Sequence, residues 1–234
     1  MLVYIVRHAE PDYSIDSLTP AGHSEARALA GRMEKIGLTH LYSSPVQRAR
    51  HTCQYTSQRL GMEMVIEPWT AELSACRRTF EPWGNLCIWD CPGEVVRAKY
   101  PLPTGDNWQE MPEFADPLIY KSFAMVRRES DGFFARHGYV RQQGRYRIAK
   151  ANRYKIAMFC HGGFGLWWLA HLLEMPLPLV FSGFFLPPSS VTTMLFDERS
   201  GDWAVPRCLG VGDVSHLYAS GLPVSRSGIK ANWE

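Results

Sequence analysis

Two histidines stand directly after short apolar runs in this sequence. His8 follows the run 2–6 and Arg7, and His161 follows the run 155–160. Both runs read as buried strands, and ligand sites in open α/β sheets lie beyond the carboxyl ends of strands. If the two strands are neighbours, the two imidazoles face one crevice. Ordinary core or surface histidines are the alternative, which their equivalent positions after two strands make weaker.

Two arginines add the capacity to bind an anion. Arg7 precedes His8, and Arg48 falls in the first turn of a helix that Ser44-Pro45 is expected to open. A guanidinium group matches two phosphate oxygens at once and stays charged at physiological pH. Helix N-termini also favour anions, and Gly162-Gly163 is expected to open a second helix. The set predicts a pocket for a dianion, although Arg48 taken alone would be read as a surface residue.

Five motifs in order resemble the histidine phosphatase superfamily, the phosphoglycerate mutase-like enzymes. The first is the run Val6-Arg7-His8-Ala9-Glu10, in which Ala9 replaces the glycine usual in the family. The other four are the runs 18–26, 42–52, 71–73 and 160–163. One such motif would be a weak signal, whereas the shared order and spacing over residues 2–72 and 155–197 is specific.

The resemblance implies a metal-independent phosphatase that needs no cofactor and takes a small phosphorylated substrate. It implies that the catalytic residues are His8, Glu72 and His161. It implies that the phosphate-binding residues are Arg7, Arg48, His161, Gly162 and Ser14. Ser14 is carried over only from its offset, where the mutases have an asparagine that touches phosphate. Glu67 and Glu81 are neighbouring acidic residues, and the Ala-Glu-Leu context favours Glu72.

The implied reaction places definite demands on these groups. His8 must attack as a neutral imidazole, with its other ring nitrogen donating to a backbone carbonyl. Glu72 must protonate the leaving alkoxide, so burial and the phosphate should raise its pKa, and it later takes a proton from water. We expect Arg7, Arg48 and a protonated His161 to stabilise the equatorial oxygens.

Three other functions compete with hydrolysis. A mutase would transfer phosphate within one substrate, but family mutases follow the glutamate with arginine and then Tyr-Gly, whereas Leu73-Ser74-Ala75-Cys76 follows here. A non-catalytic phosphate-binding protein of the same fold is the second alternative. A zinc protein built on Cys76, Cys87 and Cys91 is the third, and their spacing is poor for a structural site. Sugar phosphates, nucleotides, cofactor precursors and phosphoproteins all remain open as substrates.

The elements that must position these residues alternate between strand and helix. Helices are expected over residues 20–36, 45–60, 119–136 and 163–173. Strands are expected over residues 2–6, 38–43, 64–66, 155–160, 190–196 and 203–209. Thr19 and Pro20 suit the start of the first helix, and Gly37 and Gly61 suit two helix ends. This alternation predicts an α/β fold, a three-layer α/β/α sandwich with a mostly parallel central sheet, phosphoglycerate mutase-like.

Residues 1–234 are expected to form a single histidine phosphatase domain with an irregular, cap-like insertion at about 74–117. The insertion holds a short helix at 94–100 and several large aromatic side chains that would choose the leaving group, with ordinary packing as an equal alternative. Arg77 and Arg78 could meet a second anionic group, although a solvated pair is the commoner case. We expect a solvated loop or helix end over the basic run 141–155 and a loosely held tail from Ser220.

Composition narrows the class of protein. The chain has 234 residues, of which 46% are apolar and 21% charged, which is typical of a soluble globular protein. A net charge of +2 is too small to predict nucleic-acid or membrane-surface binding. The N-terminal run does not read as a signal peptide, and the run 164–173 is too short to span a bilayer. We expect six free cysteines and a cytoplasmic protein, and a homodimer remains open.

Overall fold

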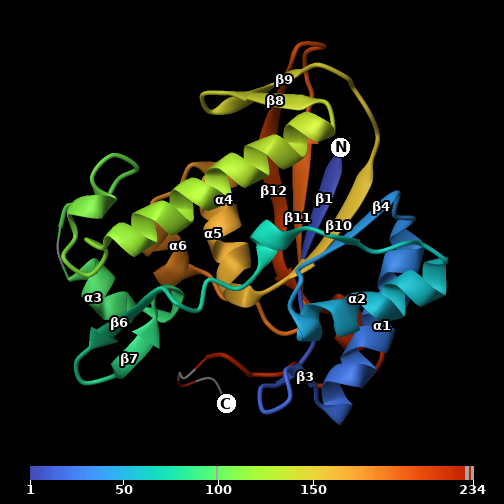
Figure 1. The fold of residues 1–234 in the computed structure, drawn as a ribbon, viewed down its shortest axis with the longest axis horizontal. Helices are drawn as coiled ribbons and strands as arrows, with labels where there is room; N and C mark the ends of the chain where they lie inside the picture. Colours follow the sequence, from blue (N-terminus) through green and yellow to red (C-terminus); the bar gives the residue numbers. More distant parts are fainter. Residues whose placement is uncertain (99, 230–231, 233–234) are drawn as a thin grey trace.

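The strand that carries Arg7 lies at the centre of an eight-stranded sheet in the computed structural model, which describes residues 1–98, 100–229 and 232 (Figure 1). The strand order is β5-β4-β10-β1-β11-β12-β9-β8. The bounds are β1 (Leu2–Arg7), β4 (His40–Ser43), β5 (Val65–Ile66), β8 (Tyr139–Gln142), β9 (Arg145–Ile148), β10 (Lys155–Cys160), β11 (Val191–Asp197) and β12 (Trp203–Asp213).

The sheet divides into two halves at β1. The strands β5, β4, β10 and β1 run parallel, whereas β11, β12, β9 and β8 pair in antiparallel fashion. The predicted α/β sandwich is confirmed, and its parallel half is the part that carries the candidate site. In that half the carboxyl ends of β1 and β10 lie side by side, because Arg7 pairs with Cys160.

Helices cover both faces of the sheet (Figure 1). Their bounds are α1 (Pro20–Ile36), α2 (Gln47–Leu60), α3 (Gly93–Arg97), α4 (Pro117–Arg136), α5 (Gly162–Leu173), α6 (Leu177–Gly183) and α7 (Ser215–Ala219). Alternate residues of β1 enter two separate cores: Val3 and Ile5 pack on the side of α4 and α5, Tyr4 and Val6 on the side of α1 and α2. A strand buried on both faces needs the continuous apolar run seen in the sequence.

The termini of α1 and α2 follow different rules. Thr19 caps α1 by accepting from the Gly22 N–H, and Gly37 ends the helix in the left-handed conformation, both as predicted. Helix α2 begins at Gln47, two residues later than predicted, and Val46 gives it no side-chain cap. Ser44 does not cap the helix as expected: its hydroxyl lies 2.8 Å from Nε2 of His161 and accepts from the Val46 N–H at 3.3 Å, before the helix begins.

The basic run 141–155 is not the loop or helix end expected from its charges. It contains most of the β8–β9 hairpin, which extends the antiparallel half of the sheet. Tyr139 and Tyr146 are fully buried, while the arginines of β9 face solvent. Strand β9 pairs with both β12 and β8, and its exposed arginines alternate with the more buried Tyr146 and Ile148, so the charges hid the alternation of the strand.

The segment between β5 and α4 contains a β-hairpin that the sequence did not predict, as β6 (Arg77–Phe80) and β7 (Gly84–Cys87). These strands form a two-stranded sheet of their own, apart from the central sheet. Helix α3 replaces the expected helix 94–100, ending at Arg97, and position 99 lies outside the described residues. The remaining elements there are the 3₁₀ helices η1 (Pro68–Thr70), η2 (Ile88–Asp90) and η3 (Trp108–Glu110).

Two short strands follow β1 as a small ribbon, β2 (Pro11–Asp12) and β3 (Ser17–Leu18). All six cysteines are free thiols, as predicted. Among the described residues, no helix is both long enough and apolar enough to cross a membrane.

Candidate active site

His8 stands at the end of β1 with its two ring nitrogens in different roles. Nδ1 lies 2.8 Å from the carbonyl oxygen of Ala9, so Nδ1 carries the hydrogen and donates. Nε2 lies 3.2 Å from Nε of Arg48 and accepts from it. These partners assign the neutral tautomer with a lone pair on Nε2. The side chain is buried, so the protein rather than solvent sets its orientation.

The loop after His8 is held by helices from the same face of the sheet. The Ala9 N–H donates to the Thr52 hydroxyl at 3.0 Å, and the Glu10 N–H donates to the buried carboxylate of Glu25 at 2.9 Å. A Cβ atom on Gly22 would lie 2.2 Å from the carbonyl oxygen of Glu10. Only glycine therefore lets α1 approach the loop this closely.

His161 lies beside His8, as their positions after neighbouring strands predict. The two ring centroids are 5.3 Å apart. Nε2 of His161 lies 2.8 Å from the Ser44 hydroxyl, whereas its buried Nδ1 has no hydrogen-bond partner among the described residues. Ser44 was singled out in the sequence only as a helix cap, so its contact with His161 is a tertiary feature that the local pattern did not reveal.

Arg7 is buried and divides its donors between two distant loops. Nη1 donates to the Leu186 carbonyl at 2.5 Å and Nη2 to the Ser227 carbonyl at 2.9 Å. Its Nε is buried without a partner among the described residues. Gly162 packs against this side chain, since a Cβ atom there would lie 3.2 Å from Cδ of Arg7. The hydrogen bond from Arg7 to the Ser227 carbonyl ties the described part of the C-terminal tail to the site. The prediction of a loosely held tail is wrong for that part.

Arg48 reaches the site from the first turn of α2, as predicted. Besides its bond to His8, it forms an ion pair of 2.6 Å with Asp16 and lies over the Tyr13 ring at 5.6 Å from the centroid. Ser14 does not join the cluster: it is exposed, and its hydroxyl donates to Asp12 at 2.6 Å. The turn that was expected to supply Ser14 instead supplies Tyr13 and Asp16.

Glu72 caps the N-terminus of α5. One carboxylate oxygen accepts from the Phe164 N–H at 2.8 Å and the other from the Gly163 N–H at 3.2 Å. Two backbone donors that the sequence offered to a phosphate are therefore bound to this carboxylate. Burial raises the pKa of Glu72, while the Phe164 N–H and Arg48 oppose the shift. The direction matches the expectation for a carboxyl group that holds a proton.

Both site histidines are neutral near pH 7. Burial, followed by the charge of Arg7, lowers the pKa of His8 well below its usual value. Burial, followed by Arg48, does the same for the pKa of His161. The free protein therefore holds His161 as a neutral ring, because two guanidinium groups already occupy the buried site, and its protonation with phosphate bound stays a prediction. Only an incoming anion would make a proton on this ring favourable.

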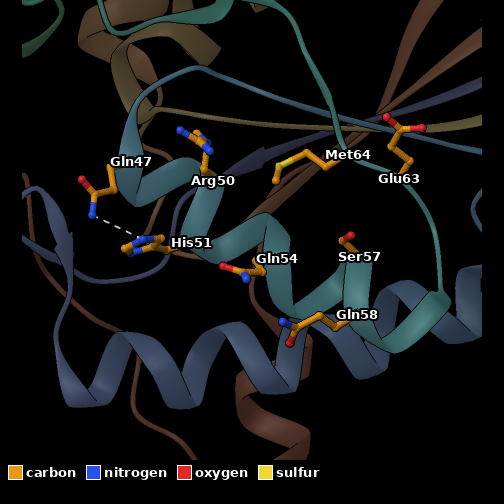
Figure 2. Close-up of a pocket in the computed structure, with 8 residues that line it drawn as sticks. All are labelled: Gln47, Arg50, His51, Gln54, Ser57, Gln58, Glu63 and Met64. Carbon is orange, nitrogen blue, oxygen red and sulfur yellow. Dashed lines mark hydrogen bonds between the residues drawn. The ribbon is translucent and has the colours of Figure 1, made fainter.

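A separate polar groove of about 560 Å³ runs along α2, and Figure 2 shows the side chains that line it. Gln47, Arg50, Gln54 and Gln58 lie along its helical wall, with Met64 across from them. None of the predicted site residues lines this groove. Among the described residues, no three histidine, cysteine, aspartate or glutamate side chains lie close enough together to hold a metal ion.

The sequence matches the profile of the histidine phosphatase superfamily (branch 1) over residues 3–207. A probable phosphoglycerate mutase from Serratia proteamaculans is 35% identical over 144 residues, which cover 50% of this chain and 67% of that protein. A putative phosphoserine phosphatase 2 from Hydrogenobacter thermophilus is 37% identical over 126 residues, covering 46% of this chain and 60% of that protein. The matched stretches thus span about two thirds or less of these relatives.

Solved structures share the fold over nearly the whole chain. A mutant phosphoserine phosphatase from Entamoeba histolytica, in complex with phosphoserine, aligns with a TM-score of 0.62 and 18% identity over 92% of this chain and 98% of that chain. A mycobacterial glucosyl-3-phosphoglycerate phosphatase aligns with a TM-score of 0.58 and 18% identity over 90% of this chain and 97% of that chain.

Proposed function

The chain belongs to the histidine phosphatase superfamily, and we propose that it hydrolyses phosphate monoesters through a phosphohistidine on His8. The observation that carries this proposal is the tautomer of His8. Its Nδ1–H donates to the Ala9 carbonyl, which leaves the Nε2 lone pair pointing into a buried site beside Arg48. A neutral imidazole held in this way is ready to act as a nucleophile.

A bound phosphate would accept hydrogen bonds from buried nitrogens of the site and would replace the bond between Arg48 and His8. Arg7 Nε and His161 Nδ1 are buried nitrogens without partners among the described residues, and unmet hydrogen-bonding capacity in a buried site favours a ligand that supplies it. Arg48 would exchange its bond to His8 Nε2 for phosphate oxygens, which frees the lone pair. His161 would take up a proton as the dianion binds, so that three cations surround the equatorial oxygens.

The proposed reaction has two balanced steps. In the first, Nε2 of His8 forms the N–P bond while the P–O bond to the alcohol breaks, and Glu72 gives its proton to the leaving oxygen. In the second, the Glu72 carboxylate takes a proton from water as that water attacks phosphorus. The N–P bond then breaks, and neutral His8 and protonated Glu72 are restored.

A mutase is the second candidate, because the Serratia relative is described as a probable phosphoglycerate mutase. The residues after Glu72 favour hydrolysis. Leu73-Ser74-Ala75-Cys76 stands where family mutases place arginine and Tyr-Gly. Formation of 2-phosphoglycerate from 3-phosphoglycerate, faster than release of inorganic phosphate, would favour the mutase.

The setting of this activity belongs to the same proposal. We propose a small phosphorylated molecule as substrate, a cytoplasmic location and one domain over residues 1–234. The segment 74–117 would be its cap-like insertion, and a homodimer remains open to measurement of mass in solution.

Direct trapping of the intermediate tests the proposal. The protein is incubated in EDTA with a panel of radiolabelled phosphate monoesters, quenched, and assayed for a label that is stable to base and labile to acid. We expect the label and steady phosphate release from the wild type and neither from His8→Ala. His23→Ala, a histidine on α1 that hydrogen-bonds Tyr55, is the matched control and should behave as wild type. Labelling of His8→Ala, or activity abolished by EDTA, would contradict the proposal.

A further inference from the structure

Trp89 lies against the N-terminus of α5 at the point where Glu72 caps that helix. A Cβ atom on Gly163 would lie 2.4 and 2.5 Å from the two carbons shared by the rings of Trp89, and 2.7 Å from Oε1 of Glu72. The middle of the indole and the carboxylate therefore both contact one glycine. Residue 163 has to be glycine for the two groups to lie this close together.

This placement puts the indole beside the leaving group. Under the proposed function, Glu72 gives its proton to the leaving oxygen, which requires a separation of about 2.6–3.2 Å between the two oxygens. The carbon bound to that oxygen then lies next to Glu72 on the side away from His8. Trp89 is the large apolar side chain that shares this position with Glu72, and it is only partly buried.

The charges around Glu72 belong to the phosphate pocket. The cations that act most strongly on its carboxyl group are Arg48 and Arg7. Arg77 is instead bound within its own hairpin, to Asn85 and Cys87. Arg78 donates to the Pro112 carbonyl at 2.7 Å and lies 3.8 Å from Asp116. The partners of Arg77 are neutral groups, so the expectation that these two arginines meet a second anionic group stays a prediction.

We propose that Trp89 forms the wall of the leaving-group site and selects phosphate monoesters of uncharged alcohols that present a flat, apolar face. An aromatic or similar group gains contact area and favourable ring geometry against the indole. A carboxylate at the same place would lose its water, and the two cations that act most strongly on Glu72, Arg48 and Arg7, are occupied by the phosphate, which is unfavourable. This inference rests on the proposed function and specifies its substrate class.

Three phosphate esters of alkyl alcohols test the inference, since each leaving group needs the proton of Glu72. They are benzyl phosphate, glycerol 1-phosphate and 3-phosphoglycerate, compared by kcat/KM. We expect benzyl phosphate to exceed 3-phosphoglycerate by about tenfold or more in the wild type. Trp89→Ala should lower kcat/KM for benzyl phosphate by about tenfold and leave glycerol 1-phosphate within about twofold. Trp89→Phe should retain most of the preference.

Two further variants keep the test decisive. Trp83→Ala removes a half-exposed tryptophan in the turn of the β6–β7 hairpin, which precedes Trp89 in the chain, and should leave kcat/KM for all three esters unchanged. Trp89→Leu keeps apolar volume without the ring, and replaces the alanine variant if that one fails to fold in a thermal melt. A wild-type preference for 3-phosphoglycerate, or an equal loss for all three esters in the Trp89 variants, overturns the inference alone. No turnover of any ester by the wild type would contradict the proposed function itself.

Discussion

The phosphate end of the sheet and the segment between β5 and α4 are built on different principles. At the phosphate end, His8 and His161 follow two neighbouring strands whose register is set by six pairs of residues. In the segment, β6 and β7 pair only with each other, and the other elements are at most five residues long. The central sheet thus positions the groups that contact the phosphate, and the segment between β5 and α4 supplies Trp89 beside the proposed site of the leaving alcohol. Chemistry and selectivity can therefore vary separately.

The strongest test of this comparison is loss of the nucleophile. His8→Ala should lower kcat by about 10³-fold or more, because no other group in the site offers an aligned lone pair. The loss should be the same factor for every ester, since His8 touches only the phosphoryl group. Phosphate release with a panel of esters measures it. A loss that varied with the alcohol would show that the two regions do not divide the work as described.

Glu72 lies where the two regions meet, so the loss of kcat/KM in its variant should depend on the leaving group. Glu72→Gln should lower kcat/KM by about 10²–10⁴-fold for alkyl esters, and by much less for p-nitrophenyl phosphate, whose leaving group needs no proton. Since burial raises the pKa of Glu72, its acid form persists to higher pH. The wild-type rate with alkyl esters should fall as pH rises through that pKa, and the variant should lack this limb. Equal losses for both ester classes would contradict the assignment.

A substitution at Gly163 tests how tightly the two regions are packed against each other. Gly163→Ala brings a methyl group to 2.4 Å from Trp89, so the free energy of unfolding should fall by about 1–3 kcal/mol. Urea unfolding provides the measurement. Gly132→Ala is the control, because that glycine lies inside α4 with nothing within 4 Å of a new Cβ atom. The control should be stabilised by about 0.5–1 kcal/mol. An equal change in the free energy of unfolding for the two variants would mean that Trp89 moves away from residue 163 at little cost.

The smallest effect on activity concerns the support of the loop after His8. Burial raises the pKa of Glu25 from 4.5 to about 7, so the folded state holds this proton more tightly than the unfolded state. Its contribution to stability is full below about pH 4.5, falls as pH rises through about 7, and then levels off. Glu25→Gln keeps an acceptor for the Glu10 N–H without the titration. Its stability relative to wild type should rise by about 2 kcal/mol from pH 5 to pH 8, with kcat unchanged. An unchanged difference across this range would contradict the buried titration.

The same division explains which features could be predicted from sequence. Arg7, His8 and His161 were accessible because buried strands have recognisable apolar runs, and parallel neighbours bring their ends together. Helix α1 was accessible because Thr19 and Gly37 are local signals. The contacts of Arg48 with Asp16, of His161 with Ser44 and of Arg7 with Ser227 were not, because each joins elements far apart in the chain. No local pattern encodes such pairings.

In the segment and in the basic hairpin, the local patterns themselves were weak. Strands β6 and β7 have four residues each and lack clean alternation of apolar and polar side chains. In β9 the alternation is present, but its apolar positions are tyrosine and isoleucine between arginines, so charge dominated the interpretation. In β8 the apolar residues Tyr139 and Val140 are adjacent, and no alternation is present. Ser14 failed because an offset within a turn does not specify which side chain faces inward.

The position of β1 also has a consequence for how the protein is made. This first strand pairs only with β10 and β11, and the carbonyls that hold Arg7 come from residues 179 and 220 positions later in the chain. During synthesis, His8 therefore leaves the ribosome long before the residues whose carbonyls hold the neighbouring Arg7. Pairing between segments so distant in sequence is slow to form, so we expect the site to form only after Ser227 has been synthesised. We expect products that terminate before this point to carry His8 but to lack phosphatase activity.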